Sequence, residues 1–299
     1  MIYNLLAKSS VVVATLFLTV FLTVHFAVAA SSGVQRVART AEQQGQSDVS
    51  NLKNISPRTG RAVGQHEPDD EGDFTEKEEI RRSFRLAPGT RVEVSGIHGA
   101  VKIETSDTDT AEVYVVRSAR RREDLKFRRI NVEQTAEGLM VRRVRESEEP
   151  NVKVRHRVVL RLPRRIELLT ESINGGVSIG EIDGPVKLRS INGGAEVALA
   201  TGYTEISSIN GGVTMTIAHL GERGVRVKSV NGGVDLRFTQ DLNADLDVSR
   251  FNGGVSAELA NVTVLIREKH LRFQARIGRG GIPITISQVN GGVSLSRSA

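Results

Sequence analysis

Residues 172–213 read SINGGVSIGEIDGPVKLRSINGGAEVALATGYTEISSINGGV, and this stretch decides the fold. It holds three copies of the motif Ser-Ile-Asn-Gly-Gly, which start 18 residues apart. Between the motifs, aliphatic residues alternate with polar ones, and this two-residue period is typical of half-buried β-strands. The stretch therefore predicts short strands joined by repeated tight turns.

The Asn-Gly-Gly motif occurs six times, with spacings of 18, 18, 21, 21 and 38 residues. Asn and Gly tolerate positive φ at low cost, so we expect each motif to form a turn. Further turns are predicted halfway between motifs, at Asp183-Gly184 and Thr201-Gly202. The last spacing is about two units long, so we expect one unit there to have lost its motif, with Gly280-Gly281 as a neighbouring turn. The motif asparagines are Asn174, Asn192, Asn210, Asn231, Asn252 and Asn290.

Two arrangements fit these turns. In one, each motif closes a hairpin and the strands form an antiparallel meander. In the other, each motif turns a corner of a coil, and the coils stack in parallel. Because whole units repeat, we favour an all-β fold with a β-solenoid, a parallel β-helix-like stack of coils of about 18–21 residues, preceded by a β-rich N-terminal region. Stacking would align the six asparagines in a ladder whose amides bond from coil to coil.

The chain divides into four predicted parts. Residues 1–30 are a signal peptide or an uncleaved membrane anchor, because residues 9–30 are uncharged, almost wholly apolar and end in small-residue cleavage sites at 27–29 and 28–30. Residues 31–78 have the polar composition of a disordered linker. Residues 79–170 form the N-terminal β region, and residues 171–299 form the Asn-Gly-Gly repeat solenoid.

The composition narrows the chemistry. The chain has no Cys, which excludes disulfides, thiolate metal sites and a cysteine nucleophile. It has no Trp and only 4% aromatic residues, so Val, Ile, Leu and Ala must build the core. We find no metal-ligand spacing among the histidines, and His98 replaces Asn in a motif-like turn, Ile97-His98-Gly99. We therefore predict no catalytic residues, no cofactor and no metal.

Positive charge is concentrated in one part of the chain, because residues 117–165 contain sixteen Lys and Arg against seven Asp and Glu. Such a cluster suits an anionic partner. The alternative is a solvated strand face whose outward positions happen to be basic. The predicted contact surface comprises Arg120, Arg121, Arg122, Arg128, Arg129, Arg142 and Arg143.

Several of these features, in this order, resemble the bacterial putative-adhesin family of β-strand-repeat envelope proteins, a domain of unknown function. They are the apolar leader, the linker, the Pro88-Gly89 turn before Val92-Glu93-Val94, the segment Gly99–Ile103, and the Asn-Gly-Gly-Val units after Leu162-Pro163. The resemblance covers about residues 79–299. It implies an extracytoplasmic β-solenoid-like domain and no catalytic residues.

We expect a non-enzymatic, adhesin-like binding or scaffolding module of the bacterial envelope, located in the periplasm, at the cell surface or in the medium. Its expected partner is an envelope protein or an anionic envelope polymer, and no specific nucleic acid. One alternative is a polysaccharide-acting β-helix enzyme, which would require Glu181, Glu196 and Glu205 to converge. The other is a self-assembling scaffold, because the chain ends soon after Asn290 with no evident cap on the solenoid end.

Overall fold

The computed structural model describes residues 74–144 and 151–298. The predicted leader and residues 31–73 of the predicted linker lie outside these residues. Within them, regular structure is β apart from one 3-10 helix, η2 (Arg122–Lys126). No helix in this described part is long and apolar enough to cross a membrane. The predicted all-β class is confirmed.

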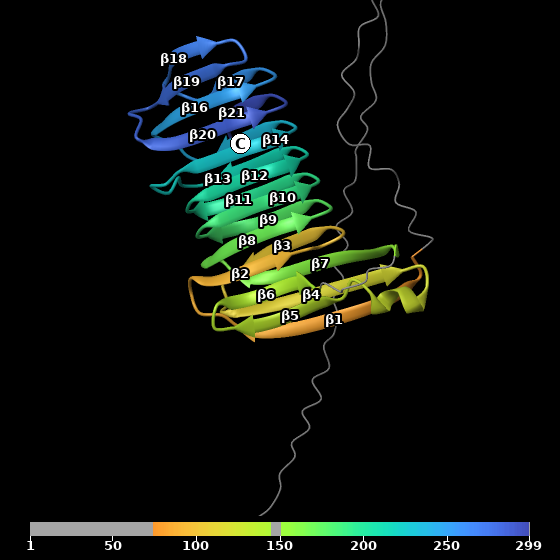
Figure 1. The fold of residues 1–299 in the computed structure, drawn as a ribbon. Helices are drawn as coiled ribbons and strands as arrows, with labels where there is room; N and C mark the ends of the chain where they lie inside the picture. The colour runs from red at the N-terminus through yellow and green to blue at the C-terminus, as the bar shows by residue number, and fades with distance from the viewer. Residues whose placement is uncertain (1–73, 145–150, 299) are drawn as a thin grey trace, which may run out of the picture. The chain divides into compact units, whose positions relative to one another are not determined.

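The strands form two mixed sheets of ten and eleven strands, together called the stack. Figure 1 shows the strands layered in one direction, with β1 and β5 at one end and β18 at the other. Sheet A contains, in spatial order, β1 (Glu76–Arg85), β4 (Thr110–Ala119), β7 (Val154–Pro163), β3 (Val101–Ser106), β9 (Val177–Asp183), β11 (Ala195–Thr201), β13 (Val213–Ile217), β15 (Val234–Phe238), β21 (Val293–Arg297) and β17 (Val255–Glu258). Sheet B contains β18 (Val262–Glu268), β19 (Arg272–Ile277), β16 (Ala244–Phe251), β20 (Ile282–Val289), β14 (Val225–Asn231), β12 (Thr204–Asn210), β10 (Val186–Asn192), β8 (Ile166–Ile173), β2 (Thr90–Ser95), β6 (Gly138–Arg143) and β5 (Ile130–Thr135).

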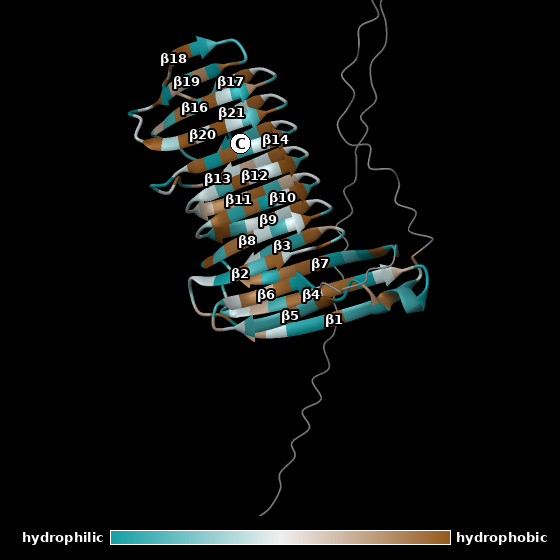
Figure 2. Ribbon diagram, in the orientation of Figure 1, coloured by the Kyte–Doolittle hydropathy of each residue, from teal (hydrophilic) through white to brown (hydrophobic). Residues whose placement is uncertain are grey.

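The core lies between the two sheets. Successive side chains of a strand point to opposite faces, so the alternating sequence buries one face of each sheet and exposes the other. In β11, for example, Ala195, Val197 and Leu199 are buried, while Glu196 is exposed. Buried residues of both sheets form one continuous hydrophobic cluster. Figure 2 shows the resulting hydrophobic bands, which recur from strand to strand along the stack.

From β8 to β15, consecutive strands lie in different sheets, and strands two places apart in the chain pair in parallel. Thus β8, β10, β12 and β14 are neighbours in sheet B. Strands β9, β11, β13 and β15 are neighbours in sheet A. The Asn-Gly-Gly turns therefore connect the two sheets, and they close no antiparallel hairpin in this region. The pairing places equivalent side chains in one buried row, namely Ile173, Ile191, Ile209 and Val230.

The backbone of the repeated turn differs from the expectation. None of the six motif asparagines has a positive φ. The residue two places before each asparagine has one instead, with values of 52–58°. The first glycine of the motif has φ of 156–159° at Gly175, Gly193, Gly211 and Gly232. Each motif therefore forms a turn, but the positive φ lies at the residue two places before the asparagine, and at four motifs also at the first glycine, not at the asparagine itself. The left-handed residues are Ser172, Ser190, Ser208, Ser229, Arg250 and Gln288.

The last spacing of 38 residues does not contain a lost parallel unit. Residues 262–277 instead form the antiparallel pair β18–β19, which extends sheet B beyond β16. After β19 the chain runs back into the stack. There β20 lies between β14 and β16 in sheet B, and β21 lies between β15 and β17 in sheet A. The segment nearest the C-terminus is thus internal. The expectation of an end formed by the last motif is wrong, because β16 and β17 occupy that position.

The N-terminal β region continues the same two sheets. Strands β2 and β3 pair in parallel with β8 and β9, as a further repeat would. His98 forms a parallel bridge with Asn174, so the motif-like turn Ile97-His98-Gly99 lies in line with the Asn-Gly-Gly turns. Beyond it, β4 pairs antiparallel with β1 and β7, and β5 pairs antiparallel with β6. Strands β1, β4 and β7 have 10 residues each, and with the shorter β5 and β6 they form the N-terminal end of the stack.

Candidate functional site

The six motif asparagines form one hydrogen-bonded row along the turn side of the stack. The Nδ2 of Asn192 donates to Oδ1 of Asn174 at 2.8 Å, and Asn210 donates to Asn192 at 2.8 Å. The row continues from Asn210 to Asn231 at 2.8 Å. Because β20 and β21 are internal, Asn290 comes next at 2.9 Å and Asn252 ends the row at 3.2 Å. Every donor points the same way, so each internal asparagine both donates and accepts.

The row meets a histidine pair at its N-terminal end. The backbone N–H of His98 donates to Nδ1 of His156 at 3.1 Å, and the other ring nitrogen, Nε2, lies 3.1 Å from the carbonyl oxygen of Arg128. One ring nitrogen must accept while the other donates, which fixes a neutral imidazole. Burial, then the neighbouring His98, lowers the pKa of His156 to about 3. The structure gives this pair a structural role within the turn.

The predicted basic surface lies at the N-terminal end of the stack and is partly neutralised by its own acids. Arg121 pairs with Glu123 and Asp124, each at 3.2 Å. Arg142 pairs with Glu133 at 2.6 Å. Arg120 lies over the ring of Phe74, with its guanidinium carbon 5.8 Å from the ring centre.

The remaining predicted residues are divided between two places. Arg122 belongs to η2, whereas Arg143 belongs to β6 and pairs with Ile130 at the start of β5. Arg128 and Arg129 precede β5, and the carbonyl oxygen of Arg129 accepts from the N–H of Val144 at 2.8 Å. The structure therefore does not place all seven arginines on one continuous surface. Arg129 and Arg143 lie at the β5–β6 end of sheet B, whereas Arg120, Arg121 and Arg122 lie at and just before η2.

The three carboxylates singled out for an enzyme do not converge. Glu181 and Glu196 belong to β9 and β11 in sheet A, whereas Glu205 belongs to β12 in sheet B. Glu181 is paired with Arg164 at 2.7 Å, and Glu205 lies 3.9 Å from Arg189. Two sheets packed face to face direct their outward side chains to opposite sides of the molecule. The geometry that the enzyme alternative requires is therefore not formed by these residues.

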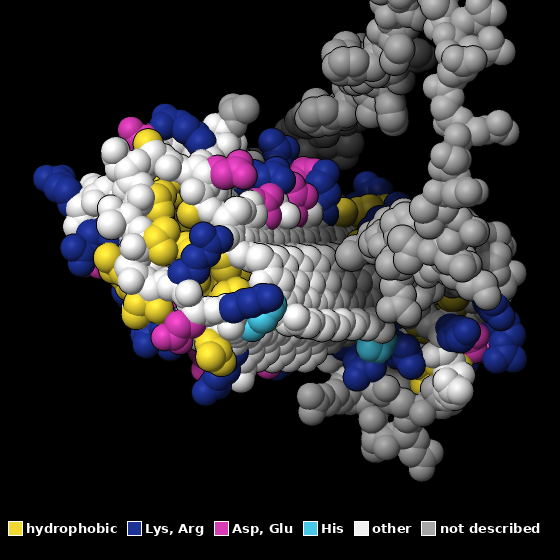
Figure 3. All heavy atoms as spheres, turned by 90° about the horizontal axis from the view of Figure 1, so that it is seen from above, with side chains coloured by type: hydrophobic (Ala, Val, Ile, Leu, Met, Phe, Trp, Pro, Cys, Tyr) yellow, Lys and Arg dark blue, Asp and Glu magenta, His cyan; other side chains and the backbone are white. Residues whose placement is uncertain are grey.

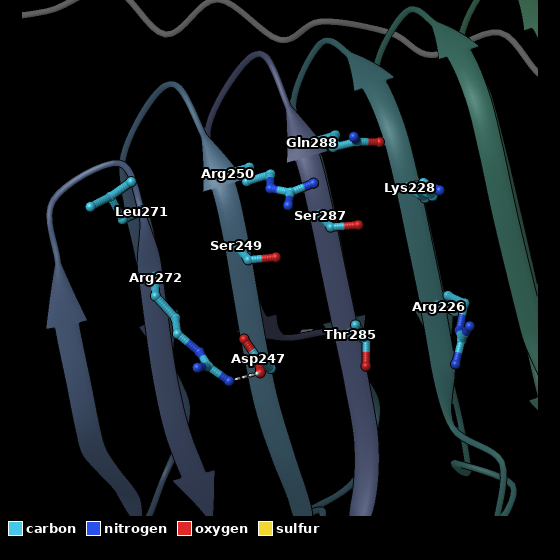
Figure 4. A pocket seen from close by; sticks show the side chains of 10 residues that line it. All are labelled: Arg226, Lys228, Asp247, Ser249, Arg250, Leu271, Arg272, Thr285, Ser287 and Gln288. Carbon is cyan, nitrogen blue, oxygen red and sulfur yellow. Dashed lines mark hydrogen bonds and ion pairs between the residues drawn. The ribbon is translucent and has the colours of Figure 1, made fainter.

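A groove that the sequence analysis missed lies on the outer face of sheet B, near the end that carries β18 (Figure 4). It has a volume of about 640 Å³, and its floor is the outer face of β20 and β16. Short side chains line this floor, and longer basic side chains from β14 and β19 rise on either side. We call it the basic groove. Its lining residues are Arg226, Lys228, Asp247, Ser249, Arg250, Leu271, Arg272, Thr285, Ser287 and Gln288.

Strand register explains how these residues meet. Lys228 pairs with Ser287, Ser287 with Ser249, and Ser249 with Arg272, so one row crosses four strands. Three strand spacings of about 4.8 Å separate the two cations by roughly 14 Å. Hydroxyl side chains are too short to fill the space between them. The groove therefore follows from placing Ser and Thr between Lys and Arg at equivalent positions of neighbouring strands.

The charges of the basic groove are unbalanced. Arg272 donates to Asp247 at 2.8 Å, which with Gln274 holds the pKa of Asp247 below its usual range. Arg226, Lys228 and Arg250 form no ion pair with any residue in the described ranges. Oδ1 of Asp247 is buried and accepts no hydrogen bond from a described residue. The groove thus offers three cations and several hydroxyl groups to a ligand.

One signal in the sequence could have located this groove. The motif places Ser two residues before the asparagine at the first four sites, but Arg250 and Gln288 stand there at the last two. Both exceptions line the groove. Because β20 inserts between β14 and β16, residues 226 and 285 become neighbours, and no spacing in the sequence predicts that contact.

Comparisons with known proteins find similar solved structures. No family model and no curated protein matches the chain. It is similar to a putative cell adhesion protein from Clostridium sporogenes, with 12% identity and a TM-score of 0.35, over 75% of this chain and 100% of that one. It is also similar to a putative adhesin from Bacteroides fragilis (9% identity, TM-score 0.29, 73% and 97% covered) and another from Parabacteroides merdae (10%, 0.27, 74% and 97%). These descriptions are of the kind that the sequence resemblance predicted.

Proposed function

We propose that this chain is an exported, adhesin-like, non-enzymatic module that binds an anionic polymer in the basic groove. One observation carries the proposal. Arg226, Lys228 and Arg250 border a single groove and have no carboxylate partner among the described residues. Cations grouped without counter-charges attract anions, and the guanidinium groups of Arg226 and Arg250 match the geometry of carboxylate, sulfate or phosphate oxygens.

The polar floor of the groove favours a polymer that also carries hydroxyl groups. Thr285, Ser287 and Ser249 can each donate and accept a hydrogen bond. These three hydroxyl side chains lie between the basic side chains of β14 and β19, so a ligand that contacts the cations also lies over them. We infer that an acidic polysaccharide of the envelope or its surroundings is the ligand class. The predicted export by residues 1–30 would bring the module to such a polymer.

The repeat region is proposed to be a two-sheeted solenoid, with each coil made of one strand from each sheet. The parallel pairing of alternate strands and the asparagine row support this interpretation. A regular stack of this kind presents an extended flat face. The basic groove is then one place on that face where an extended chain can lie across several strands.

The test compares two charge reversals of equal size in the full chain. The first is Arg226→Glu with Lys228→Glu and Arg250→Glu, and the second is Arg120→Glu with Arg121→Glu and Arg122→Glu. Binding to dextran sulfate, with uncharged dextran as control, is measured by titration at low and moderate salt. We expect the groove variant to lose at least about tenfold in affinity, since each hydrogen bond to a charged group contributes about 1.5–3 kcal/mol.

The second variant distinguishes the groove from the surface predicted by the sequence. It should bind within a few-fold of the natural chain, and both variants should retain the natural β-sheet circular dichroism. Equal losses in the two variants would mean that net charge alone drives binding. A loss confined to the second variant would move the site to η2. Either result would refute the basic groove as the binding site.

A further inference from the structure

The two sheets end at different levels at the end of the stack that carries β18. In sheet A the last strand is β17, which pairs with β21. In sheet B, β16 occupies the matching position beside β20, and two more strands follow it, β19 and then β18. Sheet B therefore extends two strands beyond sheet A. We call this feature the step, made of β17, β18 and β19.

Two of the three large hydrophobic side chains that are exposed in the described residues, Val264 and Leu265, belong to the step. Among the described residues, the large hydrophobic side chains that are exposed are Val264, Leu265 and Leu271, at 49%, 54% and 65%. Val264 pairs with the buried Ala275, so it lies on the inward face of sheet B, which sheet A covers elsewhere. Figure 3, seen from this end of the stack, shows hydrophobic side chains at the surface among charged ones.

The end of sheet A is open in the same way. Val255 and Ala257 of β17 are half-buried, whereas their paired neighbours in β21, Val293 and Leu295, are fully buried. The outer edges of β17 and β18 pair with no strand in the described part of the chain. Unpaired strand edges beside an apolar face favour the addition of a further strand.

We propose that a second copy of this chain occupies the step, so that two molecules interlock end to end. A two-fold axis parallel to the strands exchanges the two sheets and places β18 of each molecule beside β17 of the other. Each extension of sheet B then continues the partner's sheet A and covers the partner's extension. The step is self-complementary because sheet B extends two strands beyond sheet A, and the two added strands of the partner fill the space that this leaves beside sheet A.

Strand directions agree with this arrangement. β18 and β16 both run antiparallel to β19, so they share one direction. β17 runs opposite to β16, because a short turn joins them across the two sheets. A rotation about an axis along the strands leaves their directions unchanged. The new pairs of β17 with the partner's β18 are therefore antiparallel, the commoner and slightly more stable pairing.

The step is also about the right size for a stable interface. β17, β18 and β19 supply 4, 7 and 6 residues, and the turn that joins β17 to β18 adds residues 259–261. A standard protein interface involves about 20–30 residues on each side. Besides apolar contact, the pairing would satisfy two exposed strand edges in each molecule. The interface leaves the basic groove, on the outer face of sheet B, uncovered, so this inference is independent of the proposed ligand.

The test measures the mass of the full chain by sedimentation equilibrium, for the natural protein, Val264→Lys and Leu271→Lys. We expect a dimer for the natural protein and for Leu271→Lys, because Leu271 lines the outward-facing groove. Val264→Lys should be monomeric, because it places two cations in the shared apolar layer. A monomeric natural protein, or association unaffected by Val264→Lys, would overturn the proposal. If the chains associated through the apolar residues 9–30 instead, Val264→Lys would associate as the natural protein does.

A second measurement uses the absence of natural cysteines. The two-fold axis brings Val264 of the two molecules to opposite faces of one apolar layer, about 10 Å apart by the sheet spacing. A short bismaleimide cross-linker should therefore join two Val264→Cys chains, but not two Leu271→Cys chains. Equal cross-linking of both variants, or of neither, would contradict the interlocked geometry even if the protein proved dimeric.

Discussion

Gly193 packs directly against the carbonyl oxygen of Gly175 in the neighbouring repeat, and a methyl group on Gly193 would lie 2.4 Å from that oxygen. The next residue is also glycine but is not crowded. A methyl group on Gly194 would lie 3.7 Å from the nearest atom, the carbonyl oxygen of Gly212. The same contrast recurs at Gly211 and Gly212. The two glycines of the motif therefore have different functions.

We predict that Gly193→Ala destabilises the protein and that Gly194→Ala does not. The first substitution forces two backbones apart and also occupies a φ of 156°, which side chains rarely adopt. Overpacking of this kind costs about 1–3 kcal/mol, and the backbone strain adds to it. Urea unfolding of both variants measures the difference. Equal stabilities would contradict the packing observed between the turns.

The asparagine row predicts a graded loss of stability. Asn192→Ala removes two side-chain hydrogen bonds, one donated to Asn174 and one accepted from Asn210. Asn252→Ala removes one, because Asn252 ends the row. At about 0.5–1.5 kcal/mol for each bond, Asn192→Ala should cost about 1–3 kcal/mol and Asn252→Ala about half as much. Thermal unfolding of the two variants tests the order, and a larger loss at Asn252 would argue against a continuous row.

Local periodicity explains why much of the fold could be predicted. Alternation in residues 195–199 is enough to place Val197 inside and Glu196 outside, because a strand has only two faces. The position of the C-terminal repeat could not be predicted in this way. Val293 has the same local sequence as the other repeats, and its internal position depends on pairing with both Val234 and Val255. The basic groove depends on that same pairing, so it was missed too.

The internal position of β21 leads to a matched pair of core substitutions. Val293 and Val255 both follow a Gly-Gly pair, but Val293 is 2% exposed and Val255 is half-buried at the step. Val293→Ala should cost about 2 kcal/mol, and Val255→Ala less than about 1 kcal/mol, because the cavity cost rises with burial. Denaturant unfolding checks this order. If the repeats followed their sequence order, β21 would end the stack and the order would be reversed.

His156 should make stability depend on pH. Its pKa is lowered to about 3 in the folded protein from an ordinary value of 6.5, so the unfolded chain binds the proton more readily. Its neutral form therefore stabilises the fold fully above about pH 6.5, and this contribution decreases as the pH falls toward 3. Between pH 6.5 and 4.5 the loss should approach about 2 kcal/mol, at up to 1.36 kcal/mol for each pH unit.

Urea unfolding at pH 7 and pH 4.5 measures this loss in the natural protein and in His156→Gln. Glutamine can keep a donor and an acceptor in the turn but cannot be protonated, so the variant should be less sensitive to pH even if it is less stable. His219→Gln, at an exposed loop residue, is the control and should retain the natural pH dependence. The same pH dependence in all three proteins would assign the effect to other groups.

Asp247→Asn should strengthen anion binding at the basic groove. Asp247 is the single acidic residue among those that line the groove, and it engages Arg272 through an ion pair at 2.8 Å. Removing its charge leaves Arg272 available to an anion and raises the local potential.

The amide oxygen of Asn can still accept a hydrogen bond from Gln274, so we expect the groove to keep its shape. Titration with dextran sulfate should give a several-fold higher affinity, with a steeper dependence on salt because one more cation contributes. If Asp247→Asn bound dextran sulfate more weakly than the natural protein, the expected effect of charge would be wrong, and the carboxylate of Asp247 would itself contribute to binding.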